Sequence, residues 1–297
     1  MPVTLAAPQR GILLMLAAIL IFTGMDALAK GLIAQHPPLQ VVWARYAGQA
    51  VILLVILAPR LAVHLRAHAP GALALRGLAQ LGATGVFFAG LGHIGLAEAT
   101  AIMDINPVLI TLGAALFLGE RLGLRRVLGV LAAMVGAMIV IRPGLGVFSP
   151  AALFPLAAAV CYAVHALITR ATGGRDSLWT ALLWTALIGT AVTSAGLPAV
   201  WQPLAPGALP GFLAIGAIGA MGQLCLIRAF ALAEASALAP FGYVGLVFAT
   251  LWGIVLFDEW PDVWTGAGAV VIVAAGVYVW HPERAVARRA ATTAGAA

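Results

Sequence analysis

The chain has 297 residues, of which 63% are hydrophobic and only 9% are charged, and its formal net charge is +6. A soluble domain carries roughly 25% charged residues, so this composition excludes a soluble globular protein. Between breaker residues, nearly every segment is an apolar run of about 20 residues, the length that crosses a bilayer as a helix. The chain is therefore predicted to be an integral membrane protein.

In chain order, the hydrophobic pattern predicts ten membrane-spanning helices, joined by short loops that proline and glycine often mark. The predicted spans are residues 11–33, 39–58, 74–94, 98–118, 124–142, 150–170, 178–198, 208–228, 236–256 and 263–281. The first span is interpreted as a retained helix, because its apolar run is longer than the core of a cleaved signal peptide. Residues 283–297 are expected to form a disordered tail.

The basic residues are distributed unevenly between the two sides of the predicted membrane. With the N-terminus in the cytosol, only Lys30 and Arg142 fall near the outer face and Arg45 lies within a span, while the other basic residues are cytosolic. This positive-inside pattern predicts that both termini lie in the cytosol. The expected location of the protein is the bacterial inner membrane. The high basic charge thus reflects topology, and no nucleic-acid partner is expected.

The second half of the sequence repeats the first. Residues 96–101 return as 232–237, and Glu120 and Glu259 each close an apolar run and lead, at the same spacing, to a glycine and then to a proline. The first unit spans residues 1–145 and the second spans 146–282. Because each unit has five spans, the second copy must insert with the opposite orientation, and inverted repeats are a common plan of transporters.

The ten helices, the two repeats and the pattern that ends the fourth helix of each unit resemble the drug/metabolite transporter superfamily, EamA type. The pattern runs from Asn106-Pro107 to Leu122 and from Pro240 to Glu259, and the resemblance covers roughly residues 10–282. Asp258 departs from it, since glycine is usual before the glutamate. Within the superfamily, the chain is similar to the aromatic amino-acid exporter group. The resemblance implies that helices one to four of each repeat surround a central cavity and that the fifth helices are peripheral.

Four charged residues are predicted to lie within the membrane. Asp26 is roughly 22 Å from the inner face and Arg45 roughly 9 Å below the outer face, by a rise of 1.5 Å per residue. In a core about 30 Å thick these depths coincide, and Asp104 and Lys30 fall near the same level. Intramembrane charges are functional candidates by default. The cluster is interpreted as an outer gate or one end of a substrate site, with a permanent salt-bridge network, or a snorkelling Lys30, as alternatives.

Further candidates are aromatic and polar residues on the cavity helices, each of which could instead be a packing or interfacial residue. They are Trp43, Tyr46, Phe88, His93, Tyr162, His165, Trp184, Gln223 and Tyr243. Asn106-Pro107 and Pro240 with Gly242 are expected to interrupt their helices, which would point toward the binding site. The second-copy positions that match Asp26, Arg45 and Asp104 are neutral, so the inner counterpart of the charge cluster is expected to be uncharged.

The sequence contains no nucleotide-binding or hydrolase motif, so an enzyme is not expected, nor is a cofactor or a metal. Cys161 and Cys225 are expected to be buried, reduced thiols. The expected function is secondary transport that exports neutral or aromatic amino acids by alternating access. The expected partners are a small-molecule substrate and the lipid bilayer, and the protein is expected to act as a monomer or homodimer. The alternatives are a multidrug, nucleoside or other metabolite transporter of the same fold, and a structural or assembly protein of the membrane.

Overall fold

A computed structural model of the chain describes residues 7–119, 124–141, 150–172, 176–232, 238–275 and 277–278. Predictions that rest on Glu120, on Arg142 or on the tail at 283–297 lie outside these residues. Within the described residues the secondary structure is helical and includes no strand. The fold is therefore all-α.

The described helices follow the predicted spans. In chain order they are α1 (Ala7–Ile33), α2 (Pro38–Leu57), η1 (Ala58–Arg60), α3 (Leu61–Leu65), α4 (Pro70–Leu91), α5 (Leu96–Met103), α6 (Asn106–Leu118), α7 (Leu124–Ile141), η2 (Pro150–Ala152), α8 (Leu153–Ala171), α9 (Leu178–Gly196), η3 (Leu197–Ala199), α10 (Leu209–Leu232), η4 (Ala239–Tyr243) and α12 (Val244–Phe257). An apolar helix at Val263–Ala275 follows. Within the described residues, seven helices are long and apolar enough to cross a membrane, and three shorter apolar ones lie at Val127–Val140, Phe241–Phe257 and Val263–Ala275.

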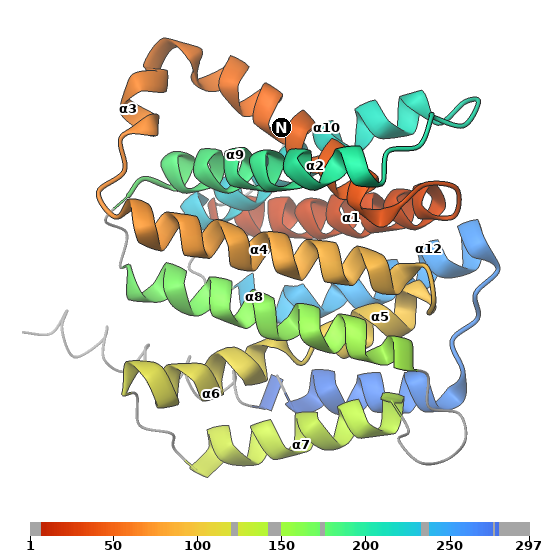
Figure 1. Cartoon of the computed structure of the whole chain (residues 1–297). Coiled ribbons are helices and arrows are strands. Elements are labelled where there is room, and N and C mark those ends of the chain that lie inside the picture. The colour runs from red at the N-terminus through yellow and green to blue at the C-terminus, as the bar shows by residue number, and fades with distance from the viewer. Residues whose placement is uncertain are drawn as a thin grey trace, which may run out of the picture.

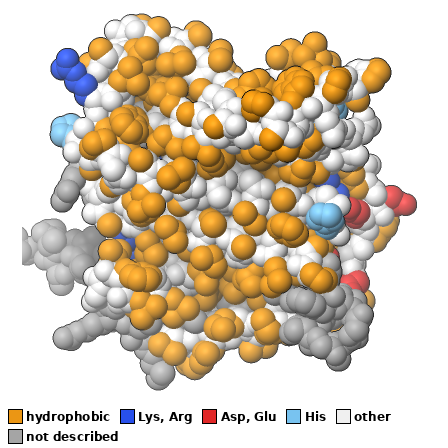
Figure 2. Space-filling model, in the orientation of Figure 1, with side chains coloured by type: hydrophobic (Ala, Val, Ile, Leu, Met, Phe, Trp, Pro, Cys, Tyr) orange, Lys and Arg blue, Asp and Glu red, His pale blue; other side chains and the backbone are white. Residues whose placement is uncertain are grey.

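The outer surface of the bundle is apolar. Figure 2 shows hydrophobic side chains over most of one face, with the charged side chains mainly toward its two ends. Val55, Phe117, Val255 and Val263 are each more than two thirds exposed. A soluble monomer rarely exposes so much contiguous apolar surface. Together with the long apolar helices, this surface identifies a multi-pass membrane protein.

The ends of the helices follow from local sequence. Proline occupies the first turn of α2 and of α4, where its missing N–H has no intrahelical partner to lose. Ser177 caps α9, because its hydroxyl accepts a 3.1 Å hydrogen bond from the N–H of Thr180. Gly119 ends α6 with φ of 68°, and Asp258 ends α12 with φ of 55°. Aspartate is one of the few residues besides glycine that adopts this left-handed conformation, which explains how Asp258 can replace the usual glycine.

Two helices are interrupted where the sequence predicted. The segment from Leu96 to Leu118 is divided into α5 and α6 by a turn at Asp104 and Ile105, directly before Asn106-Pro107. The 3₁₀ helix η4, which contains Pro240 and Gly242, precedes α12. Both predicted interruptions are confirmed. The first has a direct consequence for the site, because it places the carboxyl group of Asp104 at a bend rather than along a regular helix.

The helices run side by side, and their chain direction alternates (Figure 1). We call the two ends of the bundle the Lys30 end, where α1 meets α2, and the Leu178 end, where α9 begins. Helix α1 packs along α10, α4 packs along α8, and α2 packs against both α9 and α10. Helices α2 and α10 approach closely at Gly48, where an added Cβ would lie 2.9 Å from the Cα of Gly216.

Candidate functional site

A cavity of about 370 Å³ lies between seven of the helices. Its lining comes from α1, α2, α4, α5, α8, α9 and α10, whereas α7, α12 and the helix at Val263–Ala275 contribute no lining residue from the part of the chain that is described. The lining reaches Leu178, the first residue of α9, which is 46% exposed. On α1 it extends no farther toward the Lys30 end than Asp26. The cavity therefore approaches solvent at the Leu178 end and is closed at the Lys30 end.

Arg45 lies at the closed end of this cavity. Arg45 is on α2 and is buried, with 8% of the residue exposed. The Nη1 atom of Arg45 donates a hydrogen bond to the hydroxyl of Thr84 on α4. The guanidinium lies 5.3 Å from the ring centroid of Tyr46 and 5.7 Å from that of Phe88, which is within cation–π range. Its Nε is buried and has no hydrogen-bond partner. The guanidinium is thus held in place by neutral groups and retains a free donor.

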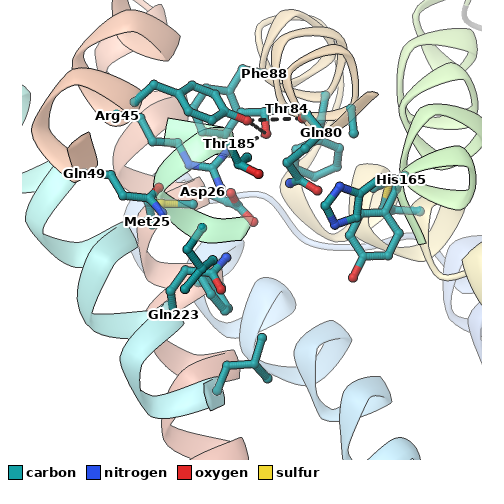
Figure 3. A pocket seen from close by; sticks show the side chains of 18 of the residues that line it. Met25, Asp26, Arg45, Gln49, Gln80, Thr84, Phe88, His165, Thr185 and Gln223 are labelled. Carbon is teal, nitrogen blue, oxygen red and sulfur yellow. Dashed lines mark hydrogen bonds between the residues drawn. The ribbon is translucent and has the colours of Figure 1, made fainter. Parts of the chain in front are cut away.

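Two carboxyl groups share the cavity with Arg45. Asp26 on α1 extends into the same space, as Figure 3 shows, and Asp104 lines the cavity from the turn that ends α5. The Oδ2 atom of Asp104 is buried without a hydrogen-bond partner. Among the described residues, neither carboxyl group forms an ion pair. The permanent salt-bridge network, which was one alternative from the sequence, is therefore absent from this conformation.

A second buried arginine lies toward the Leu178 end. Arg76 on α4 is 7% exposed and lines the cavity. Its Nε donates to the hydroxyl of Thr169 at 2.7 Å, and its Nη1 donates to the carbonyl of Ala181 and to the hydroxyl of Thr185, both at 3.0 Å. The backbone carbonyl of Arg76 accepts a 3.1 Å hydrogen bond from Nδ1 of His165. The Leu178 end of the cavity is thus also charged, through a residue that is not at any of the second-copy positions matching Asp26, Arg45 and Asp104.

The closed end is covered by an ion pair that joins three segments. Nζ of Lys30 lies 2.7 Å from Oε1 of Glu259, just beyond α12, and donates a 2.6 Å hydrogen bond to the carbonyl of Ile94. Oε2 of Glu259 accepts a 3.0 Å hydrogen bond from the N–H of Leu96. We call these four residues the Lys30–Glu259 latch. It connects α1, the α4–α5 linker with the first residue of α5, and the second residue after the end of α12.

Beyond the spans, Asp176 connects the two linkers at the Leu178 end. Its carboxylate accepts hydrogen bonds from the N–H of His68 at 2.7 Å, from the N–H of Ala69 at 3.3 Å and from Nδ1 of His68 at 3.2 Å. Desolvation disfavours the charged carboxylate, but the hydrogen bonds outweigh this effect and hold the pKa of Asp176 below its usual range. The α3–α4 and α8–α9 linkers are therefore joined by an ionised carboxylate at neutral pH.

Comparison with known proteins identifies the class. The EamA-like transporter family matches the chain twice, over residues 9–142 and 149–280. The chain belongs to this family. A pseudopaline exporter from Pseudomonas aeruginosa is 30% identical over 272 residues, which cover 90% of this chain and 94% of the exporter. This EamA-like protein is accordingly a membrane transporter and not an enzyme.

Other relatives of the transporter have different substrates. A riboflavin transporter from Rhizobium johnstonii is 31% identical over 212 residues, covering 69% of this chain and 68% of the relative. An S-adenosylmethionine uptake transporter from Rickettsia bellii is 24% identical over 259 residues, covering 87% and 89%. A solved crystal structure with 20% identity superposes with a TM-score of 0.66 over 94% of this chain and 99% of the other, so the two share a fold. These relatives are transporters of small metabolites, and the substrate of this transporter has to be argued from its cavity.

Eight of the thirteen site residues predicted from the sequence line the cavity of the transporter. They are Asp26, Arg45, Tyr46, Phe88, Asp104, Tyr162, His165 and Gln223. The other five are not among its lining residues. Lys30 is in the latch, Trp43 donates to the hydroxyl of Ser194, and Trp184 donates to the carbonyl of Leu65. His93 is exposed and stacks on Phe154, and Tyr243 ends η4.

Sequence reasoning missed a polar stripe on α4. Arg76, Gln80 and Thr84 all line the cavity of the transporter, and Figure 3 shows Gln80 and Thr84 extending into it. Their spacing of four residues places them on one face of a helix. This periodicity is a signal that could have found them, because polar residues at i, i+4 and i+8 in an otherwise apolar span mark one polar face of the helix. Gln49 follows Arg45 by the same spacing on α2 and also lines the cavity.

Proposed function

We propose that the protein is a secondary transporter that exports small zwitterionic metabolites, with amino acids as the leading class, across the bacterial inner membrane. One observation carries the proposal: a buried guanidinium and two half-buried carboxyl groups share a cavity in which none of them has an ion-pair partner among the described residues. Buried charges without partners are costly, by several kcal/mol per ion. A ligand that supplies both complementary charges would remove that cost.

The headgroup of an amino acid matches these groups. The guanidinium of Arg45 lines the cavity and can bind a carboxylate, and Asp26 or Asp104 can bind an ammonium group. Phe87, Phe88 and other apolar residues of the lining would contact a neutral or aromatic side chain. Such a site recognises the group that all amino acids share and discriminates their side chains loosely.

Alternating access in this proposal uses ten spans in two inverted repeats, 1–145 and 146–282. The two separate matches to the family support this division. The packing supports it as well. In the two repeats α1 corresponds to α8 and α4 corresponds to α10, so the contact between α1 and α10 is the counterpart of the contact between α8 and α4, and both contacts are present. The ends of the fourth helices also correspond, since Gly119 and Asp258 both adopt the left-handed conformation. Inverted repeats provide matching inward-open and outward-open states.

The orientation in this proposal follows from the positive-inside pattern, with both termini and the Leu178 end in the cytosol. The described conformation is then inward-open, with the cavity available to cytosolic substrate and the periplasmic side closed by the Lys30–Glu259 latch. This is the state in which an exporter loads. The pseudopaline relative is also an exporter, which supports the direction of transport. The protein is proposed to act as a monomer or homodimer.

The test is transport by the purified protein in liposomes, with radiolabelled phenylalanine or methionine inside and a panel of unlabelled compounds outside. We expect exchange with other neutral amino acids and no exchange with their decarboxylated amines, because the amines lack the carboxylate that Arg45 binds. The variant Arg45→Gln should abolish exchange while retaining the elution profile of the folded protein. Equal exchange with the amines would overturn the amino-acid assignment and favour the other metabolites or drugs that this fold carries.

A further inference from the structure

The environment of Arg76 differs from that of Arg45. Three hydrogen bonds from Nε and Nη1 connect Arg76 to α8 and α9, but its Nη2 donates no hydrogen bond to a described residue. The side chain lines the cavity. A guanidinium carries five N–H donors in a planar fork, so the Nη2 edge can still bind an oxyanion.

No carboxylate of a described residue balances this guanidinium. Among the described residues Arg76 forms no ion pair, and the two acidic residues of the cavity lining, Asp26 and Asp104, come from α1 and α5. Arg45 binds Thr84, which is eight residues and therefore roughly 12 Å farther along α4 than Arg76. The cavity thus has one mixed-charge end, which contains both acids, and one purely cationic end.

A purely structural role does not account for this arrangement. The hydroxyl and carbonyl partners of Arg76 are neutral, so they position the guanidinium without neutralising its charge. A buried ion that is only positioned costs free energy, and membrane helices rarely place arginine inside the bundle unless a pathway or ligand uses it. The three hydrogen bonds of Nε and Nη1 hold the Nη2 edge of the guanidinium in a fixed position, as in a group that binds a ligand.

We infer that Arg76 is a second anion-binding group and that the preferred substrates are amino-acid derivatives with a further carboxylate at the distal end of the side chain. This inference rests on the proposed function and sharpens it from neutral amino acids to amino acids that carry two carboxylates and one ammonium group. The ammonium and α-carboxylate bind at the Asp26 and Arg45 end, and the distal carboxylate binds at Arg76. An extended backbone of three residues spans roughly 10 Å, so a molecule of dipeptide to tripeptide length connects the two ends.

A matched pair of ligands tests the inference. γ-Glutamylglycine has an amino-acid headgroup at one end and a carboxylate at the other, and γ-glutamylglycinamide differs only in that its distal group is a neutral amide. Binding is measured on the purified full-length protein in detergent, from the ligand-dependent shift of its melting temperature. We expect the wild type to bind the acid at least about tenfold more tightly than the amide. A charge-assisted hydrogen bond between Arg76 and the distal carboxylate is sufficient for a difference in affinity of this size.

Two variants separate charge recognition from structural support. In Arg76→Gln, the preference for the acid should disappear and the affinity for the amide should be unchanged. Gln80→Glu leaves Arg76 and all its tethers intact, and adds a carboxylate one helical turn away on the cavity side of α4. This variant should reverse the preference in favour of the amide, and it provides the test if Arg76→Gln does not fold. Arg45→Gln should weaken both ligands equally, because they share the headgroup.

The outcomes distinguish this inference from the proposed function. Equal binding of the acid and the amide by the wild type would overturn the role of Arg76 and leave the amino-acid proposal standing. A preference for the acid that persists in both Arg76→Gln and Gln80→Glu would also overturn it. Failure of the wild type to bind either ligand or any free amino acid would refute the proposed function itself.

Discussion

In the proposed orientation, loss of the Lys30–Glu259 latch should open the transporter toward the periplasm. The variant Glu259→Gln keeps an oxygen that can accept the hydrogen bond from Leu96, but it removes the charge that faces Lys30. Lys30 then retains its hydrogen bond to the carbonyl of Ile94 and its position 5.6 Å from the ring centroid of Phe257. Because the two ends of the cavity are not open together in alternating access, weakening the closure at one end shifts the population toward the opposite state.

The geometry sets the size of this shift. The side chain of Lys30 is 11% exposed and that of Glu259 is 30% exposed, so the pair is only partly screened by solvent. A charge-assisted hydrogen bond in such a place contributes about 1–2 kcal/mol after allowance for the exposure of Glu259. That free energy changes the ratio of the two conformations by roughly 5- to 30-fold.

The assay is cysteine accessibility. Ala83 lines the cavity and is buried, so Ala83→Cys in a background without Cys161 and Cys225 reports on access to the cavity. The rate of labelling by an impermeant maleimide from outside intact cells should rise roughly 5- to 30-fold in Glu259→Gln, because the rate is proportional to the population of the conformation that is open to the outside. Labelling in inside-out vesicles should fall correspondingly.

The neighbouring acid provides a matched control. Asp258→Asn removes a negative charge at the same end of the bundle, and asparagine tolerates the left-handed conformation of this residue. It leaves the latch intact, so the labelling rate should not change. The reasoning would be refuted if Glu259→Gln labelled at the wild-type rate from both sides, or if Asp258→Asn had the same effect.

Four further predictions concern the site, the topology and the stability of the fold. Arg45→Ala and Asp26→Ala should each reduce transport to background, because each removes a charged group of the cavity that the proposed function assigns to the headgroup of the substrate. Recovery of transport in the exchanged double variant would show that the two residues act as a pair and not as separate binding groups, whereas normal transport by both single variants would exclude a role in the mechanism. Cysteines in the α3–α4 linker should be labelled from the cytosolic side only, and strong labelling from outside intact cells would reverse the proposed orientation. Because the pKa of Asp176 is lower in the folded protein, its stabilising effect is present above the usual aspartate pKa and is lost as pH falls through the folded value. The difference in melting temperature between the wild type and Asp176→Asn should therefore shrink below about pH 4, and a constant difference would contradict this assignment. Gly216→Ala should destabilise the protein by about 1–3 kcal/mol, because the added Cβ would clash with the backbone of α2. Gly85→Ala should not destabilise it, because a Cβ at Gly85 has open space. Similar melting temperatures for the two variants would be inconsistent with this packing.

The sequence alone determined the class of protein, the positions of the helices and part of the site. Long apolar runs and breaker residues are local properties, so they predicted the described helices and the interruption at Asn106-Pro107. The rise of 1.5 Å per residue also gave the depth of a charge in the membrane, which brought Asp26, Arg45 and Asp104 to one cavity. Depth along the bilayer normal is the one coordinate that sequence position fixes.

Rotation about the helix axis and the contacts between helices were decided only by the tertiary structure. Trp43 is close to Arg45 in sequence, but it lies on another side of α2 and donates to Ser194. Lys30 lies one turn from Asp26, yet its long side chain reaches Glu259, which is distant in sequence. Arg76 was expected at the cytosolic boundary, whereas the packing of α4 against α8 and α9 encloses it in the cavity. These partners lie on different helices, and nothing in a local hydrophobic pattern specifies which faces of two distant helices will meet.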